Sequence, residues 1–347
     1  MKIFLLFILA GIMVVTGVAT IDNLNSLGRV EVVEAPLSQV ANITIKEILT
    51  PQKKAFVSST TIKEDDKVSV KEVEGVNSIA DLSEKLGVEL NSSNLEQGQV
   101  LFLRVSGFKN EISVNFLGKT LSLITLQDDI VAFAGIDAKQ TPGNYDLVVT
   151  DGEEEVVKKI FVNDARFPVT KIVVTPKLEE QGFTPENIVQ SFEKSENVQL
   201  REAMEYSREI PYFDKPFRVP LDKKVVVGNF GNIRQEGEAA FQHLGVDLDA
   251  AVGDSLYAMN NGKIIFQKEL PTYGKTLIID HGVGIFSIYL HLDQFLKNLG
   301  EEVLKGELVG RTGNTGYSIE PHLHLSLKIN GASVDPLEFI KASEKLE

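Results

Sequence analysis

Between residues 99 and 165 the chain alternates short apolar runs with turn residues. The runs are rich in β-branched, leucine and aromatic residues, and sequences such as the TPGN of residues 141–144 separate them. They cover residues 100–105, 112–116, 121–126, 130–134, 145–150 and 156–162. Short strands at this spacing predict a β-sandwich, so we expect an immunoglobulin-like domain over residues 96–165.

The pattern then becomes helical. Thr184 suits an N-cap and Pro185 the first helical position, which predicts a helix or helix pair from here to about residue 208. Three prolines, at positions 211, 216 and 220, precede a second series of short strands with glycine turns. We therefore expect a helical connector over residues 166–215 and a further β domain over residues 216–347, in a mainly β protein.

The N-terminus has a different pattern. An almost wholly apolar run covers residues 3–19 and follows Lys2, as in a secretory signal peptide. The run is also close to the shortest length that spans a membrane, so residues 1–21 are expected to be a cleaved signal or an N-terminal anchor. Either reading places the protein in the periplasm, the cell envelope or the medium, with a possible membrane tether.

Residues 22–95 form a mixed region. Within it, residues 78–86 have apolar positions at helical spacing, and the stretch SIADLSEKLGVEL of residues 78–90 resembles the helical part of a LysM wall-binding module. The pattern leaves open whether residues 22–95 bind the cell wall or inhibit the rest of the protein.

Composition narrows the possible partners and ligands. The chain has 347 residues, 24% of them charged and 43% hydrophobic, which is ordinary for globular protein. A net charge of −14 argues against nucleic acid as a partner, because phosphate recognition needs a cationic surface. The chain contains no cysteine, so any metal must be held by histidine and carboxylate.

All five histidines fall between positions 243 and 324. His243 and Asp247 would share one face of a strand, and a helix would also bring positions i and i+4 together. His322 and His324 share a face on a strand, so one ring can bind a metal while the other stays free. Histidine and carboxylate ligands with an open position are typical of catalytic zinc.

A series of motifs in this region resembles a known family. The chain resembles the lysostaphin/LytM-type zinc metallopeptidases, which are peptidoglycan endopeptidases, over about residues 216–342. The motifs occur in the family's order: FGxxR (230–234), HLGVDL (243–248), AxxGxxxxA (250–258), NGKI (261–264), YGKTLIIDHG (273–282), YLHL (289–292), LKGELVGRTGNTG (304–316), PHLHL (321–325) and VDPLEFI (334–340).

The resemblance implies a fold and a set of roles. The fold would be an antiparallel β-sheet of the duplicated hybrid motif type. One Zn²⁺ would be bound by His243, Asp247 and His324, and His291 and His322 would be the catalytic pair. Zinc-bound water would be the nucleophile with a histidine as general base, and the substrate would be the peptide stems of peptidoglycan.

Several alternatives stay open. The main rival function is a non-catalytic, peptidase-like activator of a cell-wall amidase, although such proteins typically lose ligands. A scaffold with a structural zinc would not need His291 and His322. His281 is expected to be structural, and Arg234 is equally compatible with a substrate contact and with an ion pair inside the fold.

Overall fold

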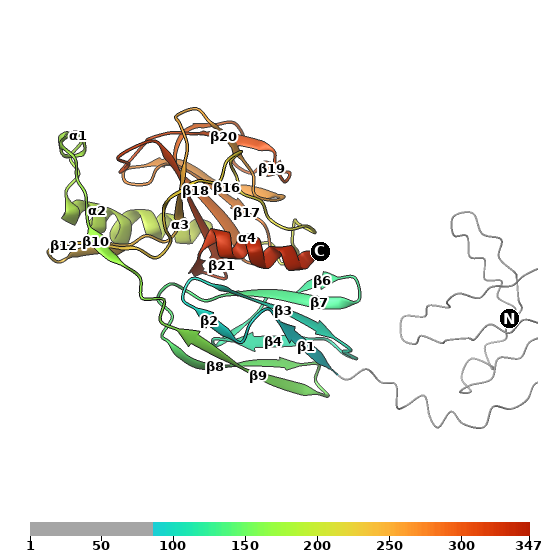
Figure 1. Ribbon diagram of the computed structural model, residues 1–347. Helices are drawn as coiled ribbons and strands as arrows, with labels where there is room; N and C mark the ends of the chain where they lie inside the picture. Colours follow the sequence, from blue (N-terminus) through green and yellow to red (C-terminus); the bar gives the residue numbers. More distant parts are fainter. Residues whose placement is uncertain (1–85) are drawn as a thin grey trace, which may run out of the picture. The chain divides into compact units, whose positions relative to one another are not determined.

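The computed structural model describes residues 86–347, which contain two β-rich regions and a group of short helices (Figure 1). The predicted signal or anchor, the mixed region up to residue 85 and most of the helix predicted over residues 78–86 lie outside the described residues. Over residues 86–347, no helix is both long and apolar enough to cross a membrane.

The first β-rich region is a sandwich of two sheets. One sheet has the strand order β1 (Gly87–Leu90), β3 (Val100–Ser106), β7 (Asp129–Gly135) and β6 (Ile124–Leu126). The other has the order β2 (Asn94–Glu96), β9 (Glu155–Asn163), β8 (Gly143–Thr150), β4 (Ser113–Phe116) and β5 (Lys119–Thr120). Alternate residues of both sheets meet in one core, including Leu101, Leu103, Ala132, Leu147 and Ile160.

This sandwich agrees with the predicted strands, except that the strand predicted over residues 121–126 is only Ile124–Leu126, and it begins earlier than residue 96. β1 pairs with β3 and β2 pairs with β9, so both belong to its sheets. The end of the stretch that resembles a LysM helix, residues 87–90, is therefore a strand. The first sheet has the order that immunoglobulin sandwiches label ABED, and the second contains their CFG order. Relationship to that family stays a prediction.

The connector begins with a strand and continues as helices: β10 (Val169–Lys171), α1 (Pro176–Glu180), α2 (Pro185–Ser191), a π-helical turn (Phe192–Glu196) and α3 (Asn197–Ala203). The predicted start at Thr184 is confirmed, because its hydroxyl accepts the Asn187 N–H while the Asn187 side chain accepts the Thr184 N–H. The helix ends at Ala203, before the predicted residue 208.

The C-terminal region is built on a large antiparallel sheet. Its main path has the order β11 (Val226–Gly228), β14 (Val246–Asp249), β21 (His322–Ile329), β18 (Ile285–Phe295), β17 (Gly274–Asp280), β16 (Gly262–Leu270) and β19 (Glu302–Val303). β15 (Ser255–Tyr257), β20 (Leu308–Thr312) and β22 (Ala332–Val334) extend it. β10 joins β12 (Ile233–Glu236) and β13 (Ala239–Gln242) in a small sheet. The chain ends in α4 (Pro336–Ser343) and a 3₁₀ turn (Glu344–Leu346).

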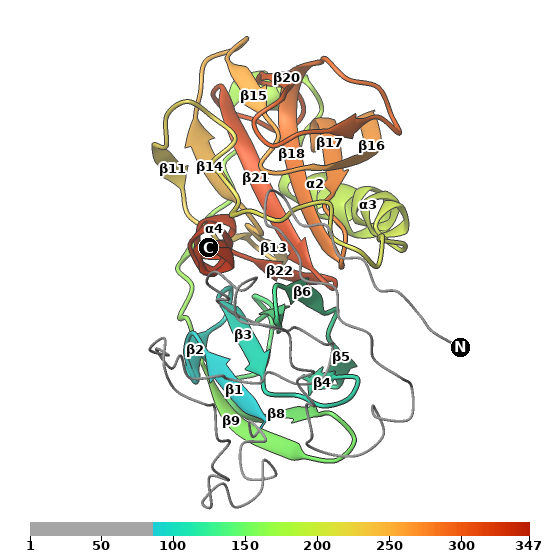
Figure 2. The same ribbon diagram turned by 90° about the vertical axis from the view of Figure 1, so that its right-hand side faces the viewer.

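This architecture confirms the predicted mainly β fold with an antiparallel C-terminal sheet. Figure 2 shows β21 lying between β14 and β18. Leu323, Leu325 and Leu327 of β21 are fully buried in the core on one face of the sheet. Leu200 of α3 and Leu290 of β18 belong to one hydrophobic cluster on the opposite face. The residues between the leucines of β21 therefore point toward the side that the helices border.

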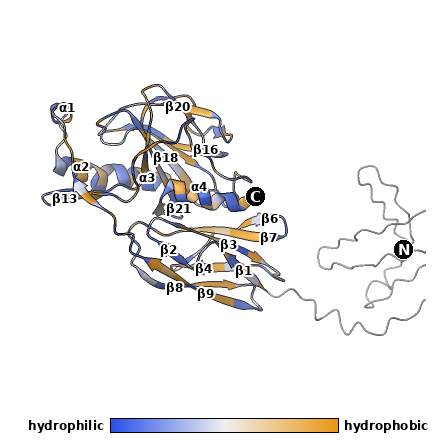
Figure 3. Cartoon of the chain, in the orientation of Figure 1, coloured by the Kyte–Doolittle hydropathy of each residue, from blue (hydrophilic) through white to orange (hydrophobic). Residues whose placement is uncertain are grey.

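Aromatic residues form a core that the sandwich and the C-terminal sheet share. The Phe133 ring of β7 lies 5.4 Å from the Phe339 ring of α4, and the Phe339 ring lies 4.7 Å from that of Phe217. Backbone hydrogen bonds join the same surfaces, with Asp335 N–H donating to the Gly98 carbonyl at 2.8 Å. Figure 3 shows hydrophobic residues along the strands of both regions.

Phe133→Ala should lower the free energy of unfolding by about 3–5 kcal/mol, because removing a buried ring leaves a cavity. Denaturant unfolding of the full chain measures this change. Phe161→Ala is the matched control, since that ring on β9 is 43% exposed, and it should change stability by no more than about 0.5 kcal/mol. Equal effects of the two substitutions would contradict the shared core.

Candidate metal centre

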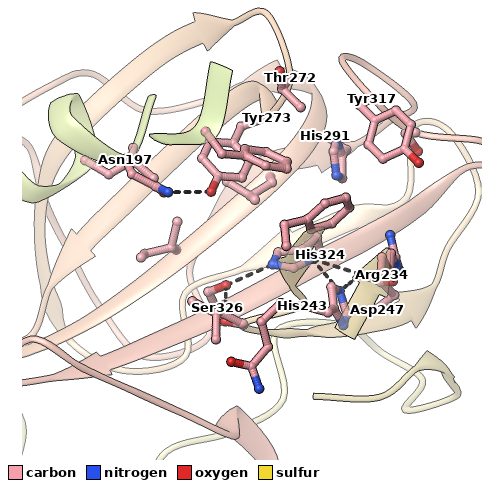
Figure 4. A pocket seen from close by; sticks show the side chains of 18 of the residues that line it. Asn197, Arg234, His243, Asp247, Thr272, Tyr273, His291, Tyr317, His324 and Ser326 are labelled. Atoms are coloured by element: carbon pink, nitrogen blue, oxygen red, sulfur yellow. Dashed lines mark hydrogen bonds and ion pairs between the residues drawn. The ribbon is translucent and has the colours of Figure 1, made fainter. Parts of the chain in front are cut away.

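The three residues predicted as ligands converge at one point. His243 Nε2 and His324 Nδ1 each lie 2.9 Å from Asp247 Oδ1, and the two nitrogens are 3.0 Å apart. All three residues are buried. The strand register explains the meeting, because Asp247 of β14 is directly opposite His324 of β21, and His243 follows the end of β13. Figure 4 shows the three side chains pointing toward one another.

Hydrogen bonds on the far side of each ring decide which nitrogen faces this point. His243 Nδ1 lies 2.7 Å from the Asn229 carbonyl, which can only accept, so Nδ1 carries the proton. Ser326 donates its hydroxyl proton to the Leu244 carbonyl and therefore accepts from His324 Nε2–H at 2.9 Å. Burial lowers the pKa of His324 to about 4, so the ring is neutral at pH 7.

The three facing atoms are thus lone-pair donors with no proton between them. Such an arrangement needs a cation, and imidazole nitrogen with carboxylate oxygen is the ligand set that zinc prefers. Ligand atoms on a zinc tetrahedron are about 3.3 Å apart, so separations of 2.9–3.0 Å need only a small opening. The residues present fit zinc.

Two glycines make room for the ligands. A Cβ atom at Gly245 would lie 2.5 Å from His324 Nε2. A Cβ atom at Gly228 would overlap the Asp247 carboxylate. The second Asp247 oxygen, Oδ2, lies 3.5 Å from Arg234 Nη2, so this structure favours the ion-pair reading of Arg234. Arg234 and the glycines together fix the orientation of the carboxylate.

His322 and His291 border the three ligands. His322 is two residues before His324 on the same face of β21, and its Nε2 lies 3.6 Å from Asp247 Oδ1. The His291 ring on β18 is 5.0 Å from that of His322. His322 Nδ1–H donates to the Glu320 carbonyl and His291 Nδ1–H donates to the Thr315 carbonyl, each at 2.8 Å. Both rings therefore present an unprotonated Nε2.

A backbone irregularity turns His291 toward the site. Along β18, Tyr289 and Leu292 belong to the main core while Leu290 packs on the helix side. His291 has φ of +61° and lies where the pairing with β17 is shifted, so it faces the same cavity as Leu290. Burial, together with His322 and His324, lowers the pKa of His291 to about 3.

His281 lies outside this group, as expected for a structural residue. Its Nδ1–H donates to the Asn261 carbonyl at 2.7 Å, and its Nε2 is 2.7 Å from the Ser287 hydroxyl. The ring is fully buried, and burial lowers its pKa to about 4. Both nitrogens are engaged, so none is free for a metal or a substrate.

The four clustered histidines open into a cavity of about 1070 Å³. Strands β18 and β21 contribute one side of its lining, and residues of α2, the π-helical turn and α3 contribute another. The helical connector is thus a wall of the candidate site, which the sequence had indicated only as a link between domains.

Glu196 is the residue that ties this wall to the histidines, and sequence reasoning missed it. Its buried carboxylate accepts the backbone N–H groups of Thr272 and Tyr273, both at 2.8 Å, and the Ser191 hydroxyl at 2.6 Å. The Tyr273 carbonyl in turn accepts the His291 N–H at 3.1 Å. No local pattern around Glu196 signals this role, because the turn that it holds, Thr272 and Tyr273, is more than 70 residues away in the chain.

The part of the chain that contains the candidate metal ligands is similar to known peptidases. Residues 241–336 match the model of peptidase family M23. The peptidoglycan DD-endopeptidase ShyA of Vibrio cholerae is 30% identical over 124 residues, which are 35% of this chain and 29% of that protein. The DD-carboxypeptidase/endopeptidase Mpg of Neisseria meningitidis is 38% identical over 95 residues, 27% of this chain and 22% of that protein.

A third relative has a different description. The murein hydrolase activator NlpD of Salmonella dublin is 32% identical over 125 residues, which are 36% of this chain and 31% of that protein. The chain therefore spans less than a third of each of these three relatives.

Glu196→Gln should lower the free energy of unfolding by about 1–3 kcal/mol, because an amide NH₂ would face a buried backbone N–H. Chemical denaturation measures the loss, and the amide NMR signals of Thr272, Tyr273 and His291 should shift. Glu186→Gln is the control, since that side chain is exposed in the first turn of α2. Unchanged signals in the Glu196 variant would show that the carboxylate does not hold this turn.

Proposed function

The domain that contains residues 241–336 belongs to peptidase family M23, and from this premise we propose that the chain is an exported zinc metallo-endopeptidase that cuts peptide cross-links of peptidoglycan. The observation that carries the proposal is the complete cluster: three ligand atoms within 3.0 Å of one another, with two further histidines beside them. The similarity to ShyA, a peptidoglycan DD-endopeptidase, supports the substrate class, and the similarity to Mpg, a DD-carboxypeptidase/endopeptidase, supports the reaction class.

His243, Asp247 and His324 would hold the metal. Zinc bound there would lower the pKa of a water ligand toward ~7 and polarise the carbonyl of the scissile bond. The protein's contribution is to keep both imidazoles neutral and correctly oriented, through the Asn229 carbonyl and the Ser326 hydroxyl.

His322 is the candidate general base. Its unprotonated Nε2 lies beside the ligand cluster, where it can take a proton from the attacking water. The Glu320 carbonyl, which accepts from Nδ1–H, would stabilise the ring once it becomes cationic. The same ring can then return the proton to the leaving amine.

His291 would be the second proton-handling group. It is nearly fully buried, and its Nε2 is unprotonated while the ring is neutral. It can accept a hydrogen bond from water or substrate, and it can donate from Nε2 only after gaining a proton. Beside His322, it would stabilise developing negative charge on the substrate only in its cationic form, after Nε2 has taken up a proton.

The substrate class implies the location. Peptidoglycan lies outside the cytoplasmic membrane, so the enzyme would act in the periplasm or cell envelope. Export would depend on residues 1–21, as a signal or as a membrane tether, in agreement with their sequence.

Similarity to NlpD supports one rival function, a non-catalytic activator of a cell-wall amidase. The intact cluster favours the enzyme, because an activator needs neither the two unprotonated nitrogens of His291 and His322 nor an open metal position. The rival predicts that the protein stimulates an amidase while cutting no peptide bond itself.

The decisive variant is His322→Ala. It should retain about one zinc per chain, because His322 is outside the ligand set, but lose at least about a hundredfold of the rate of cross-link cleavage. Digestion of purified peptidoglycan followed by mass spectrometry measures the rate, and metal analysis of the same preparation is the control. Zinc loss in this variant would make His322 a ligand, and an inactive wild type that stimulates an amidase would favour the rival function.

A further inference from the structure

The helix-side face of β21 carries a row of polar residues. His322, His324, Ser326 and Lys328 alternate with buried core residues, and all four line the cavity. At about 3.3 Å per residue, Lys328 is about 13 Å along the strand from His324. The cavity therefore contains the ligand group His243, Asp247 and His324 at one place and Lys328 farther along β21.

Lys328 has an unusual environment for a lysine. It is only partly exposed, and its ammonium group donates to the Ser333 hydroxyl. Over residues 86–347, no carboxylate oxygen lies within 4.0 Å of its Nζ. Burial lowers the pKa of Lys328, with Lys139 contributing in the same direction and Asp137 opposing.

Lys139 lines the same cavity and likewise forms no ion pair with another described residue. The neighbouring Asp137 is already engaged, because its two oxygens accept the backbone N–H groups of Ser333 at 2.7 Å and Lys139 at 2.8 Å. Glu202 of α3 and Glu205, two residues after that helix, line the cavity as well, but neither is within ion-pair distance of a lysine there.

A partly buried ammonium group without a carboxylate partner favours binding an anion that enters the cavity. Consider a peptide that lies extended along β21 with its scissile bond at the three candidate metal ligands. Each residue spans about 3.3–3.6 Å, so the peptide residue beside Lys328 would be three or four positions from the scissile bond. A free carboxylate at that position would supply the missing charge.

We propose that Lys328, assisted by Lys139, is a specificity-determining residue that binds a free carboxylate of the substrate peptide about 13 Å from the bond that is cut. This inference rests on the proposed function, because it takes the cavity as the site of a peptide substrate. It adds that the preferred substrate is an acidic peptide with its carboxylate three or four residues from the cleavage site.

The test compares Lys328→Met with wild type on two matched peptidoglycan fragments. One is a cross-linked peptide dimer with free carboxylates, and the other is the same dimer with those carboxylates amidated. Lys328→Met should raise the KM for the free dimer about tenfold or more, with kcat within about twofold, because a charge-assisted hydrogen bond is lost. The KM for the amidated dimer should not change.

Three further variants separate charge from structure. Lys328→Arg should keep the preference for the free dimer, and Lys139→Met should raise its KM by about threefold, as expected for a more exposed charge. Lys305→Met is the matched control, because that lysine is exposed and outside the cavity. If Lys328→Met loses zinc or has a lowered melting temperature, the test rests on Lys139→Met instead. An unchanged KM of Lys139→Met for the free dimer would then overturn the inference.

Binding distinguishes failure of this inference from failure of the proposed function. If wild type cuts neither dimer, the proposed activity is wrong, and calorimetry with the free dimer still tests the lysine. In His322→Ala, adding Lys328→Met should weaken binding of the free dimer about tenfold or more. Equal affinity with and without Lys328, or equal KM values for the two dimers in wild type, would overturn the inference.

Discussion

The C-terminal site depends on one constraint: three unprotonated ligand atoms lie within 3.0 Å of one another, and only a cation between them makes that arrangement favourable. Hydrogen bonds on the far side of the two ligand rings produce this arrangement, because the Asn229 carbonyl and the Ser326 hydroxyl each accept the N–H of one ring. The same principle extends to His291 and His322, whose N–H groups also point at backbone carbonyls. Four imidazoles are thereby held with one nitrogen free toward a common space.

The rest of the fold can be understood as support for that arrangement. Pairing of β14 with β21 sets Asp247 opposite His324, and Gly245 lets the chain pass close to the His324 ring. A shifted pairing in β18 brings His291 to the same side, and Glu196 of the helical wall holds the turn that contacts it. The wall and the sheet together line the cavity, and β21 carries both the candidate ligand His324 and, farther along, Lys328.

Much of this was predictable where the signal is local. Alternation predicted the strands of the sandwich, the Thr184 cap predicted the start of a helix, and strand parity placed His322 and His324 on one face. Alternation alone could not place His291, because the positive φ of +61° reverses the side that its position in the strand would give. Only the resemblance of the motifs pointed to it. Glu196 could not be predicted at all, since its role comes from contacts with a turn more than 70 residues away.

Metal stoichiometry of the purified chain tests the central claim most directly. Elemental analysis of wild type, with His243→Ala and Asp247→Ala prepared in parallel, should find about one zinc per chain in wild type and almost none in either variant, because each removes one of three protein ligands. Wild-type protein that binds no stoichiometric zinc when zinc is supplied, or variants that both keep the metal, would contradict the account.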